Sequence, residues 1–461
     1  MDKKKTIGII FATIILIATW FIQTPEGLTM AGKNSLGVLL CALVLWTTEA
    51  IPVAVTSLAI IVLQPIYGIA VLDTAFKEFI SPVIFFVIAT YGVSVAIMKT
   101  PLASRMARWL LKRAGNDSGK VILAFSIASA LISTIVSNVP ATVLFMSLAM
   151  SILVKTGAKP GSSQLGKALM IAIPFAAMIG GIATPAGSSI NILALYMLEK
   201  YAQLQITFLD WIIFGLPIAI IMVPISSLIL VKIFKPEPIE IDLTSILKET
   251  DEEKGLSIME KKVLIIVMLM MVFWVASTWV PVINITMVAI VGLIAFFLPG
   301  INVLTWDEFS AEVGWDAVLM IGGVTSIGAG VVASGLSTWF LDAVLHNFVG
   351  MPLVPLTFLV GMIMNLLHLV LPIGPALVSI AVQPLSDLSG VIGVSPVVFG
   401  VTTAFMAGCC MLLPLDAVPL ITYNKKYYSM LDMFKSGIIV SSIWALLIAL
   451  WVPFVASQLN Y

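Results

Sequence analysis

Apolar stretches long enough to cross a membrane follow one another along almost the whole chain, and this pattern limits the possible folds more than any other feature. A bilayer core about 30 Å thick needs about 20 apolar residues in a helix. With a window of about 19 residues, about eleven stretches are predicted to span the membrane. They are roughly residues 6–22, 34–50, 52–72, 80–98, 168–198, 207–233, 263–281, 283–300, 316–334, 395–423 and 436–457. The expected fold class is an all-α polytopic membrane protein.

The composition supports this class and excludes several others. Hydrophobic residues make up 60% of the 461 residues and charged residues 10%, whereas soluble domains have about 45–50% and about 25%. The chain is too apolar to be disordered, and its 24 basic and 24 acidic residues leave no positive excess for nucleic acid. Its three cysteines lie in apolar stretches, which predicts neither disulfides nor a metal site. Without a catalytic motif, we expect a protein that is not an enzyme.

Two apolar stretches, residues 120–156 and 351–394, are too long for one crossing and are broken by proline near the middle. The breaks are Ser137-Asn138-Val139-Pro140 and Pro372-Ile373-Gly374-Pro375. We interpret both stretches as re-entrant hairpins, which enter and leave on the same side of the membrane. With this topology nearly every Lys and Arg falls in a cytoplasmic loop, as the positive-inside rule requires. We therefore expect a multi-pass cell-membrane protein with a cytoplasmic N-terminus and an external C-terminus.

A polar segment, residues 235–262, separates two halves with matching landmarks. Phe76-Lys77-Glu78-Phe79 precedes one span and Trp306-Asp307-Glu308-Phe309 another, while Leu209-Asp210-Trp211 corresponds to Leu431-Asp432-Met433. Equivalent spans run in opposite directions, so we expect an inverted repeat, the layout of many secondary transporters. The expected units are an N-terminal span (1–33), a first repeat (34–234), a cytoplasmic linker (235–262) and a second repeat (263–461).

Two further helices are expected to break inside the membrane, at Thr184-Pro185 and between Pro414 and Pro419. Non-helical backbone at this depth is tolerated where it is buried in protein or lines a polar cavity, and inverted symmetry brings the four breaks together. Each break begins a half-helix, whose free amides and positive dipole end attract anions. No Lys or Arg lies in mid-span, so we expect helix ends and hydroxyl groups to hold an anion.

Ionisable residues inside spans are functional candidates because they are expensive to place there. Asp416 lies in the second broken span and is either an ion-pair partner of Lys425 or Lys426 or a coupling site for a proton or cation. His368 precedes the second hairpin tip and is either a packing residue or a pH-sensitive coupling residue. Asp316 stands at the start of a span and is expected to cap it.

Motifs along nearly the whole chain resemble those of the divalent anion:sodium symporter family, the INDY-type dicarboxylate transporters. The segment Trp46-Thr47-Thr48-Glu49-Ala50-Ile51-Pro52 looks like the family's Trp-x-Thr-Glu-Ala-Ile-Pro element. Ser137-Asn138 looks like the start of its first Ser-Asn-Thr tip, and residues 180–191 resemble its first broken span. The resemblance implies a homodimer, in which each protomer has a scaffold domain and a transport domain that moves like an elevator. It also implies transport of C4 and C5 dicarboxylates such as succinate, malate, fumarate and 2-oxoglutarate.

The breaks and the resemblance together indicate one set of candidate substrate-binding residues. They are Ser137, Asn138, Val139, Thr184, Gly187, Ser188, Asn191, Gly374, Pro375, Ala376, Val418 and Pro419. Some of them depart from the family pattern: Val139 replaces a Thr, Gly374-Pro375-Ala376 replaces the second Ser-Asn-Thr, and Ala417-Val418-Pro419-Leu420 replaces a Thr-Pro-Pro-Asn-like element.

These departures bear on coupling, because sodium prefers oxygen ligands and the replaced side chains supplied them. We therefore expect a sodium-independent dicarboxylate exchanger without a cofactor. One alternative is a sodium-coupled symporter, for which sodium is the only cofactor. The other is proton coupling through Asp416 or His368.

Overall fold

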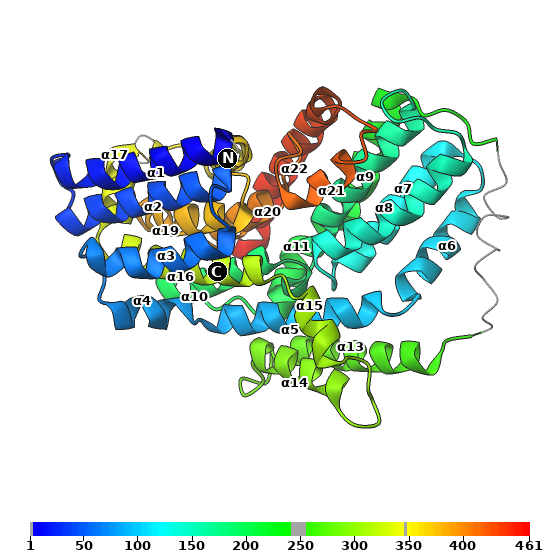
Figure 1. Ribbon diagram of the computed structural model, residues 1–461, viewed down its shortest axis with the longest axis horizontal. Helices are drawn as coiled ribbons and strands as arrows, with labels where there is room; N and C mark the ends of the chain where they lie inside the picture. Colours follow the sequence, from blue (N-terminus) through cyan, green and yellow to red (C-terminus); the bar gives the residue numbers. More distant parts are fainter. Residues whose placement is uncertain (1–2, 241–254, 345–347) are drawn as a thin grey trace.

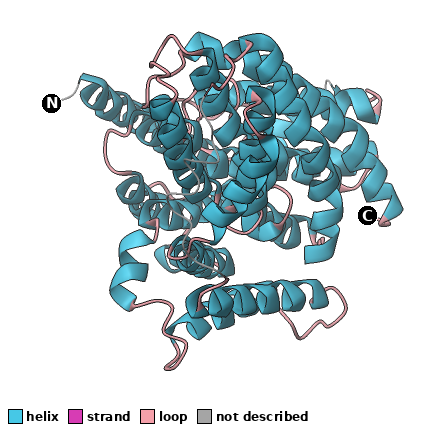
Figure 2. Cartoon of the chain, turned by 90° about the vertical axis from the view of Figure 1, so that its right-hand side faces the viewer, coloured by secondary structure: helices cyan, strands magenta, loops and turns pink. Residues whose placement is uncertain are grey.

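The computed structural model describes residues 3–240, 255–344 and 348–461 (Figure 1). Every regular element in these ranges is a helix, and Figure 2 shows helices joined by loops. Ten of the described helical segments are long and apolar enough to cross a membrane. The predicted all-α class is therefore confirmed, while the number of crossings stays a prediction.

The same order of elements occurs twice along the chain. The first half has α1 (Lys3–Phe21), α2 (Met30–Thr48), α3 (Val53–Ile66), α4 (Leu72–Phe79), α5 (Pro82–Met98), α6 (Leu102–Ala114), α7 (Ser118–Ser133), α8 (Asn138–Lys155), α9 (Gln164–Gly181), the 3-10 turn η1 (Pro185–Gly187), α10 (Ser189–Ala202) and α11 (Phe208–Phe234). The second half has α13 (Ile258–Ala276), α14 (Ile285–Phe297), α15 (Trp306–Glu312), α16 (Trp315–Ala333), α17 (Leu336–Val344), α18 (Leu353–Val370), α19 (Gly374–Ile392), α20 (Pro396–Ala407), α21 (Ala417–Tyr423) and α22 (Met430–Gln458). In this order α2 to α11 correspond to α13 to α22. The inverted orientation in a membrane and the domain bounds stay predictions.

The two halves pack crosswise. Helix α3 packs against α16, and their counterparts α14 and α5 pack against each other. In the same way α10 lies on α19 while α21 lies on α8, and the final helices α11 and α22 pack together. Figure 1 places α7 and α8 at the end of the molecule opposite α1, α2 and α19. Each half therefore completes the core of the other.

Helix α9 lies in the middle of this core. Every residue of α9 except Gln164 and Lys167 is buried, as expected for a helix that is apolar on all sides. Gly180 lets α9 approach α7 closely, because a Cβ at this position would lie 2.2 Å from the carbonyl oxygen of Ala130. The close approach places the end of α9 beside the turn that joins α7 to α8.

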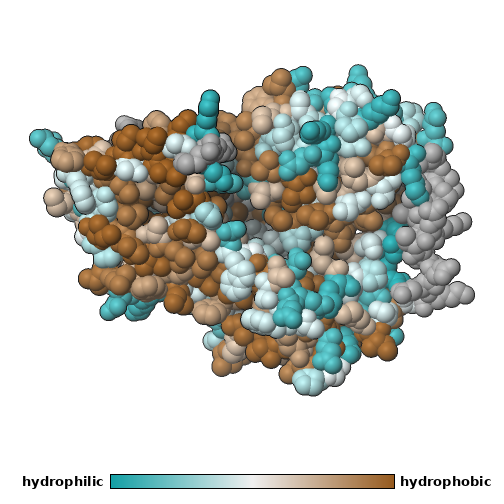
Figure 3. Space-filling model, viewed as in Figure 1, coloured by the Kyte–Doolittle hydropathy of each residue, from teal (hydrophilic) through white to brown (hydrophobic). Residues whose placement is uncertain are grey.

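The outer surface is also largely apolar. Large apolar side chains such as Ile14, Ile220 and Phe454 are exposed, and Figure 3 shows brown surface over most of the visible face with hydrophilic groups gathered in patches. A surface of this kind is unfavourable in water but suits contact with lipid. The described chain is thus a multi-pass membrane protein.

The Asp residues matched between the halves have the same local role. Asp210 forms a capping box with Thr207 at the start of α11, and each backbone N–H donates to the other's side chain at 3.1 Å. Asp432 forms the same box with Ser429 at the start of α22, at 2.9 and 3.1 Å. A carboxylate in the first turn also interacts favourably with the helix dipole.

The capping role predicted for Asp316 is wrong. The N-cap residue of α16 is Gly314, which has no side chain to cap with. The Asp316 carboxylate instead accepts a hydrogen bond from the backbone N–H of Ala54 at 3.4 Å, at the start of α3. It therefore joins two helices from different halves.

The expected linker, residues 235–262, lies partly outside the described residues. Near its beginning, the Glu237 carboxylate accepts hydrogen bonds from the backbone N–H groups of Gln164 (2.7 Å) and Leu165 (2.5 Å) at the start of α9. Near its end, Glu260 lies 2.8 Å from the Arg105 guanidinium of α6 and is fully buried. Both ends of the linker are thus attached to helices of the first half.

Candidate functional site

The structure interrupts helices at the four predicted places. In the first half these are tip 1 (residues 134–137, between α7 and α8) and break 1 (residues 182–188, between α9 and α10). In the second half they are tip 2 (residues 371–373, between α18 and α19) and break 2 (residues 408–416, between α20 and α21). Helices α8, α10 and α19 therefore begin at interruptions, with backbone amides that have no partner inside their own helix.

Close contacts bring the interruptions of the two halves together. A Cβ on Gly374, the first residue of α19 after tip 2, would lie 2.2 Å from the Ile190 side chain of α10 and 2.7 Å from the carbonyl oxygen of Ala407. A Cβ on Gly408, in break 2, would lie 3.8 Å from Ile182 in break 1. Break 1 and tip 1 are also joined, since the Thr184 hydroxyl donates to a tip 1 carbonyl oxygen at 2.5 Å.

Break 1 is held open by its own polar side chains. The Asn191 amide of α10 donates to the carbonyl oxygens of Gly181 (2.8 Å), the last residue of α9, and of Thr184 (2.9 Å) in the break. The Thr184 hydroxyl oxygen accepts from the backbone N–H of Gly187 at 3.1 Å, and the Ser188 hydroxyl caps α10. Thr184, Ser188 and Asn191 therefore lie together at break 1, where their hydrogen bonds maintain the non-helical backbone; their role in substrate binding stays a prediction.

Asn138, directly after tip 1, is the first residue of α8, not its cap. The N-cap of α8 is Ser137, whose side chain makes no capping hydrogen bond. The buried Asn138 amide oxygen instead accepts from the Ser133 hydroxyl at 2.6 Å. Val139 follows on the exposed side of the first turn. Sequence reasoning missed Ser133, the last residue of α7, because it lies five positions before Asn138 and the two meet only through the turn of tip 1.

Tip 2 has no polar side chain at the start of its half-helix. Gly374, Pro375 and Ala376 open α19 and are all buried. The N-cap, Ile373, makes no side-chain hydrogen bond, and Pro375 has no backbone N–H. The structure thus confirms where the second half-helix starts, and its first turn offers fewer hydrogen-bonding groups than that of α8.

Break 2 contains the most unexpected contact of the site. Asp416 is the N-cap of α21, and its Oδ1 accepts from the backbone N–H of Val418 at 3.0 Å. No ion pair joins it to Lys425 or Lys426 in the described part of the chain, where both lysines are exposed, so the ion-pair interpretation is wrong. Val418 and Pro419 are buried in α21.

His368 lies in α18, away from these contacts. Its side chain is buried, and neither ring nitrogen has a hydrogen-bond partner among the described residues. One turn earlier, the Asn365 amide donates to the Ser441 hydroxyl of α22 at 3.0 Å. No hydrogen bond or ion pair among the described residues links His368 to tip 2, and its role stays a prediction.

Charged side chains are kept away from the interruptions, apart from Asp416. The ion pairs of the described residues are Lys99–Glu308, Arg105–Glu260, Lys167–Asp432 and Lys200–Glu78. None of these residues belongs to a tip or a break, and the tips and breaks contain no Lys or Arg. An anion at this site would be held by helix starts and hydroxyl groups. The described residues contain no cluster of His, Cys, Asp and Glu that could bind a metal ion.

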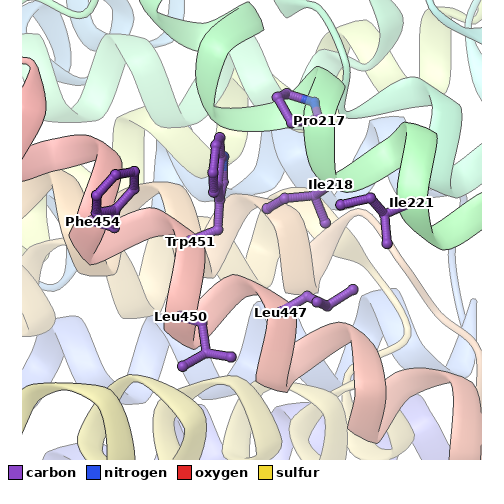
Figure 4. Close-up of a pocket in the computed structure, with 7 residues that line it drawn as sticks. All are labelled: Pro217, Ile218, Ile221, Leu447, Leu450, Trp451 and Phe454. Atoms are coloured by element: carbon purple, nitrogen blue, oxygen red, sulfur yellow. The ribbon is translucent and has the colours of Figure 1, made fainter.

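A groove of about 170 Å³ between α11 and α22 is a separate feature (Figure 4). Its lining is apolar: Pro217, Ile218, Ile221, Leu447, Leu450, Trp451 and Phe454. The only polar group of these side chains, the Trp451 indole N–H, donates to a backbone carbonyl oxygen at 3.2 Å. The groove therefore offers nothing to bind an anion.

Converging interruptions at the starts of membrane helices define the class of this protein: it has the architecture of a secondary transporter. Residues 3–457 match the family described as the sodium:sulfate symporter transmembrane region. The chain therefore belongs to that family, the divalent anion:sodium symporters that its motifs resemble.

Individual proteins resemble the chain over nearly its whole length. A protein of Staphylococcus saprophyticus described as the sodium-dependent dicarboxylate transporter SdcS is 25% identical, over 98% of this chain and 91% of its own. SdcS of Staphylococcus aureus strain USA300 is 26% identical with the same coverage. The solved transporter YdaH of Alcanivorax borkumensis has a TM-score of 0.57 at 13% identity, over 98% of this chain and 99% of its own. At this identity YdaH is similar in fold alone.

Proposed function

We propose that this protein carries C4 and C5 dicarboxylates across the cell membrane and catalyses no chemical reaction. Relatives of similar length are described as dicarboxylate transporters. The helix starts at α8, α10 and α19 support an anion held by backbone amides and hydroxyls, without Lys or Arg. Succinate, malate, fumarate and 2-oxoglutarate are the candidate substrates.

We further propose that transport is sodium-independent exchange. The observation that carries this proposal is the start of α19, where Gly374, Pro375 and Ala376 provide no side-chain oxygen for a cation. A symporter needs a cation site so that the empty carrier does not move without its ion. Without such a site, a second dicarboxylate must load the carrier for its return.

The proposed cycle is an elevator movement in a homodimer. The two hairpins (α7 with α8, and α18 with α19) and the two broken helices (α9 with α10, and α20 with α21) form the transport domain. The helices around them form the scaffold domain. In this division the ion pair between Lys200 of α10 and Glu78 of α4 joins the two domains. The N-terminus is placed in the cytoplasm and the C-terminus outside.

Sodium-coupled symport is the second candidate, because the relatives are described as sodium-dependent. Backbone carbonyl oxygens of the breaks would then replace the missing side chains as ligands. Proton coupling is supported by one observation, the carboxylate of Asp416 in break 2, which has no cationic partner among the described residues. His368 is the other candidate for this role.

Uptake of labelled succinate into proteoliposomes separates these mechanisms. The vesicles are either empty or preloaded with unlabelled succinate, in sodium or choline buffer. Exchange predicts uptake into preloaded vesicles only, at the same rate in both buffers. Uptake into empty vesicles driven by a sodium gradient would refute exchange in favour of symport, and uptake driven by a proton gradient would support proton coupling.

A further inference from the structure

Helix α6 is amphipathic, and every ionisable residue in it is basic. Its buried residues recur every three or four positions, at Ala103, Ala107, Leu111 and Ala114, and α6 packs on α7 (Figure 1). The rest of the helix carries four cations and no Asp or Glu: Arg105, Arg108, Lys112 and Arg113. A basic amphipathic helix that also exposes a tryptophan is typical of a helix lying at a membrane surface.

Trp109 and Arg113 stand together on the exposed side of α6. The exposed fraction of Trp109 is 55%. The guanidinium carbon of Arg113 lies 3.5 Å from the centre of the Trp109 indole ring, a distance at which a cation is attracted to the face of the ring. Arg113 is therefore held at a fixed place beside an exposed aromatic ring.

Two cations of α6 have no acidic partner. Arg105 pairs with the buried Glu260 at 2.8 Å and so attaches α6 to α13. Arg108 and Arg113 make no ion pair with any residue in the described part of the chain. Arg108 is partly exposed and lies four positions before the exposed Lys112, so these two residues form a row next to that of Trp109 and Arg113. We call Arg108, Trp109, Lys112 and Arg113 the basic patch.

The equivalent helix of the second half has no such patch. In the order of elements α17 corresponds to α6, and Asp342 is its only ionisable residue. The indole N–H of its tryptophan, Trp339, donates to the carbonyl oxygen of Glu26 at 3.0 Å, within the protein. Helix α17 thus leads from a span into a hairpin without any basic residue. The charge of α6 is not required by this architecture, so it indicates an interaction with something outside the chain.

We propose that the basic patch binds the phosphate headgroup of an anionic phospholipid. Guanidinium groups match the geometry of phosphate oxygens, and tryptophan is enriched at the level of lipid headgroups. With the proposed topology α6 lies on the cytoplasmic side, where anionic lipids attract basic segments close to the membrane. Only Gly115, Asn116 and Asp117 separate α6 from α7, so a headgroup bound here also holds the start of the first hairpin.

Lipid binding to the purified full chain in detergent tests the proposal. Phosphatidylglycerol and phosphatidylcholine with the same acyl chains are titrated, and bound lipid is counted by native mass spectrometry. We expect the wild type to bind phosphatidylglycerol at least about tenfold more tightly, because each basic residue near the headgroup contributes roughly fivefold. The double variant Arg108→Gln/Arg113→Gln should lose about 10- to 30-fold in affinity for phosphatidylglycerol and none for phosphatidylcholine.

The matched control is Lys425→Gln/Lys426→Gln, which removes two exposed charges beyond the end of α21 and should keep the wild-type preference. An equal loss in this control would assign lipid binding to net charge and overturn the patch. Equal binding of the two lipids by the wild type would also overturn the proposal. Displacement of phosphatidylglycerol by millimolar inorganic phosphate would do the same, because the patch would then be a site for a soluble anion.

Folding and transport do not confuse this test. The comparison of two lipids in the wild type needs no variant, and retained binding of phosphatidylcholine shows that the double variant is folded. The measurement involves no dicarboxylate. The lipid site and the proposed transport function can therefore fail independently of each other.

Discussion

Replacing Gly181 with alanine tests whether the amide of Asn138 contributes to substrate binding. Gly181 is the last residue of α9, and a Cβ there would lie 2.1 Å from the Asn138 Oδ1 atom and 3.1 Å from its Nδ2 atom. No Cβ tolerates such a contact, so the amide must rotate away. The rotation breaks the 2.6 Å hydrogen bond from the Ser133 hydroxyl and changes which way tip 1 presents its amide.

The expected magnitudes differ between stability and binding. Losing one neutral hydrogen bond lowers the free energy of unfolding by about 0.5–1.5 kcal/mol, and an off-rotamer side chain adds about 0.5–1.5 kcal/mol. A hydrogen bond to a charged carboxylate contributes about 1.5–3 kcal/mol, which corresponds to about 10- to 150-fold in affinity. Gly181→Ala should therefore remain folded and lose at least about tenfold in dicarboxylate affinity.

The assay compares succinate binding and thermal unfolding of purified Gly181→Ala with those of Gly390→Ala. Gly390 is the matched control, because it lies inside α19 and a Cβ there meets nothing within 4 Å. Alanine at that position should stabilise the helix by up to about 1 kcal/mol and leave affinity unchanged. Wild-type affinity in Gly181→Ala, together with a lowered unfolding temperature, would refute the binding role and leave Asn138 as a structural residue of tip 1.

Three further predictions concern the linker, the domain contact and the topology. Partial burial alone would raise the pKa of the Glu237 carboxyl, but hydrogen bonds from the backbone N–H groups at the start of α9 hold this pKa below its ordinary value. Glu237→Gln should therefore be less stable than the wild type at neutral pH. Urea unfolding should show that this stability difference disappears as pH falls below about 4. A stability difference that does not depend on pH would contradict this expectation. Reversing one charge of the Lys200–Glu78 pair should lower stability, and reversing both should restore about 0.5–3 kcal/mol in a double-mutant cycle; additive losses would mean the pair is not coupled. In a cysteine-free background, a cysteine at Gly161 should be labelled from the cytoplasm and one at Asn460 from outside. Labelling of position 161 from outside would mean that the first hairpin crosses the membrane and would overturn the hairpin topology.

Much of the fold was predictable because its signals are local. The apolar stretches, the prolines that interrupt them and the capping residues act within one or two turns of the same segment. Pro375 shows this well, since a proline suits the first turn of a helix and disrupts the interior of one. The equivalence of Asp210 and Asp432 was also visible, because each closes a capping box with the residue three positions before it.

The partners of the site residues were not predictable in the same way. Ser133 bonds Asn138 only because a tight turn reverses the chain between α7 and α8. Asp316 contacts Ala54 across 262 positions, and Lys200 meets Glu78 across 122. Hydrogen-bond and ion-pair partners so far apart in the chain are selected by helix packing, which no local pattern encodes.

Asp416 shows where the two kinds of information meet. A carboxylate in an interrupted membrane helix is unusual enough for the sequence to mark it as functional. Two lysines within ten positions made an ion pair the natural interpretation, because sequence distance was the only distance available. In the fold, the turn after α21 leaves both lysines exposed, while the backbone N–H of Val418 lies 3.0 Å from the carboxylate. The apolar stretches and the prolines that break them were sufficient to place the chain in a membrane with four interruptions, but the direction of each polar side chain depended on how the two halves pack together.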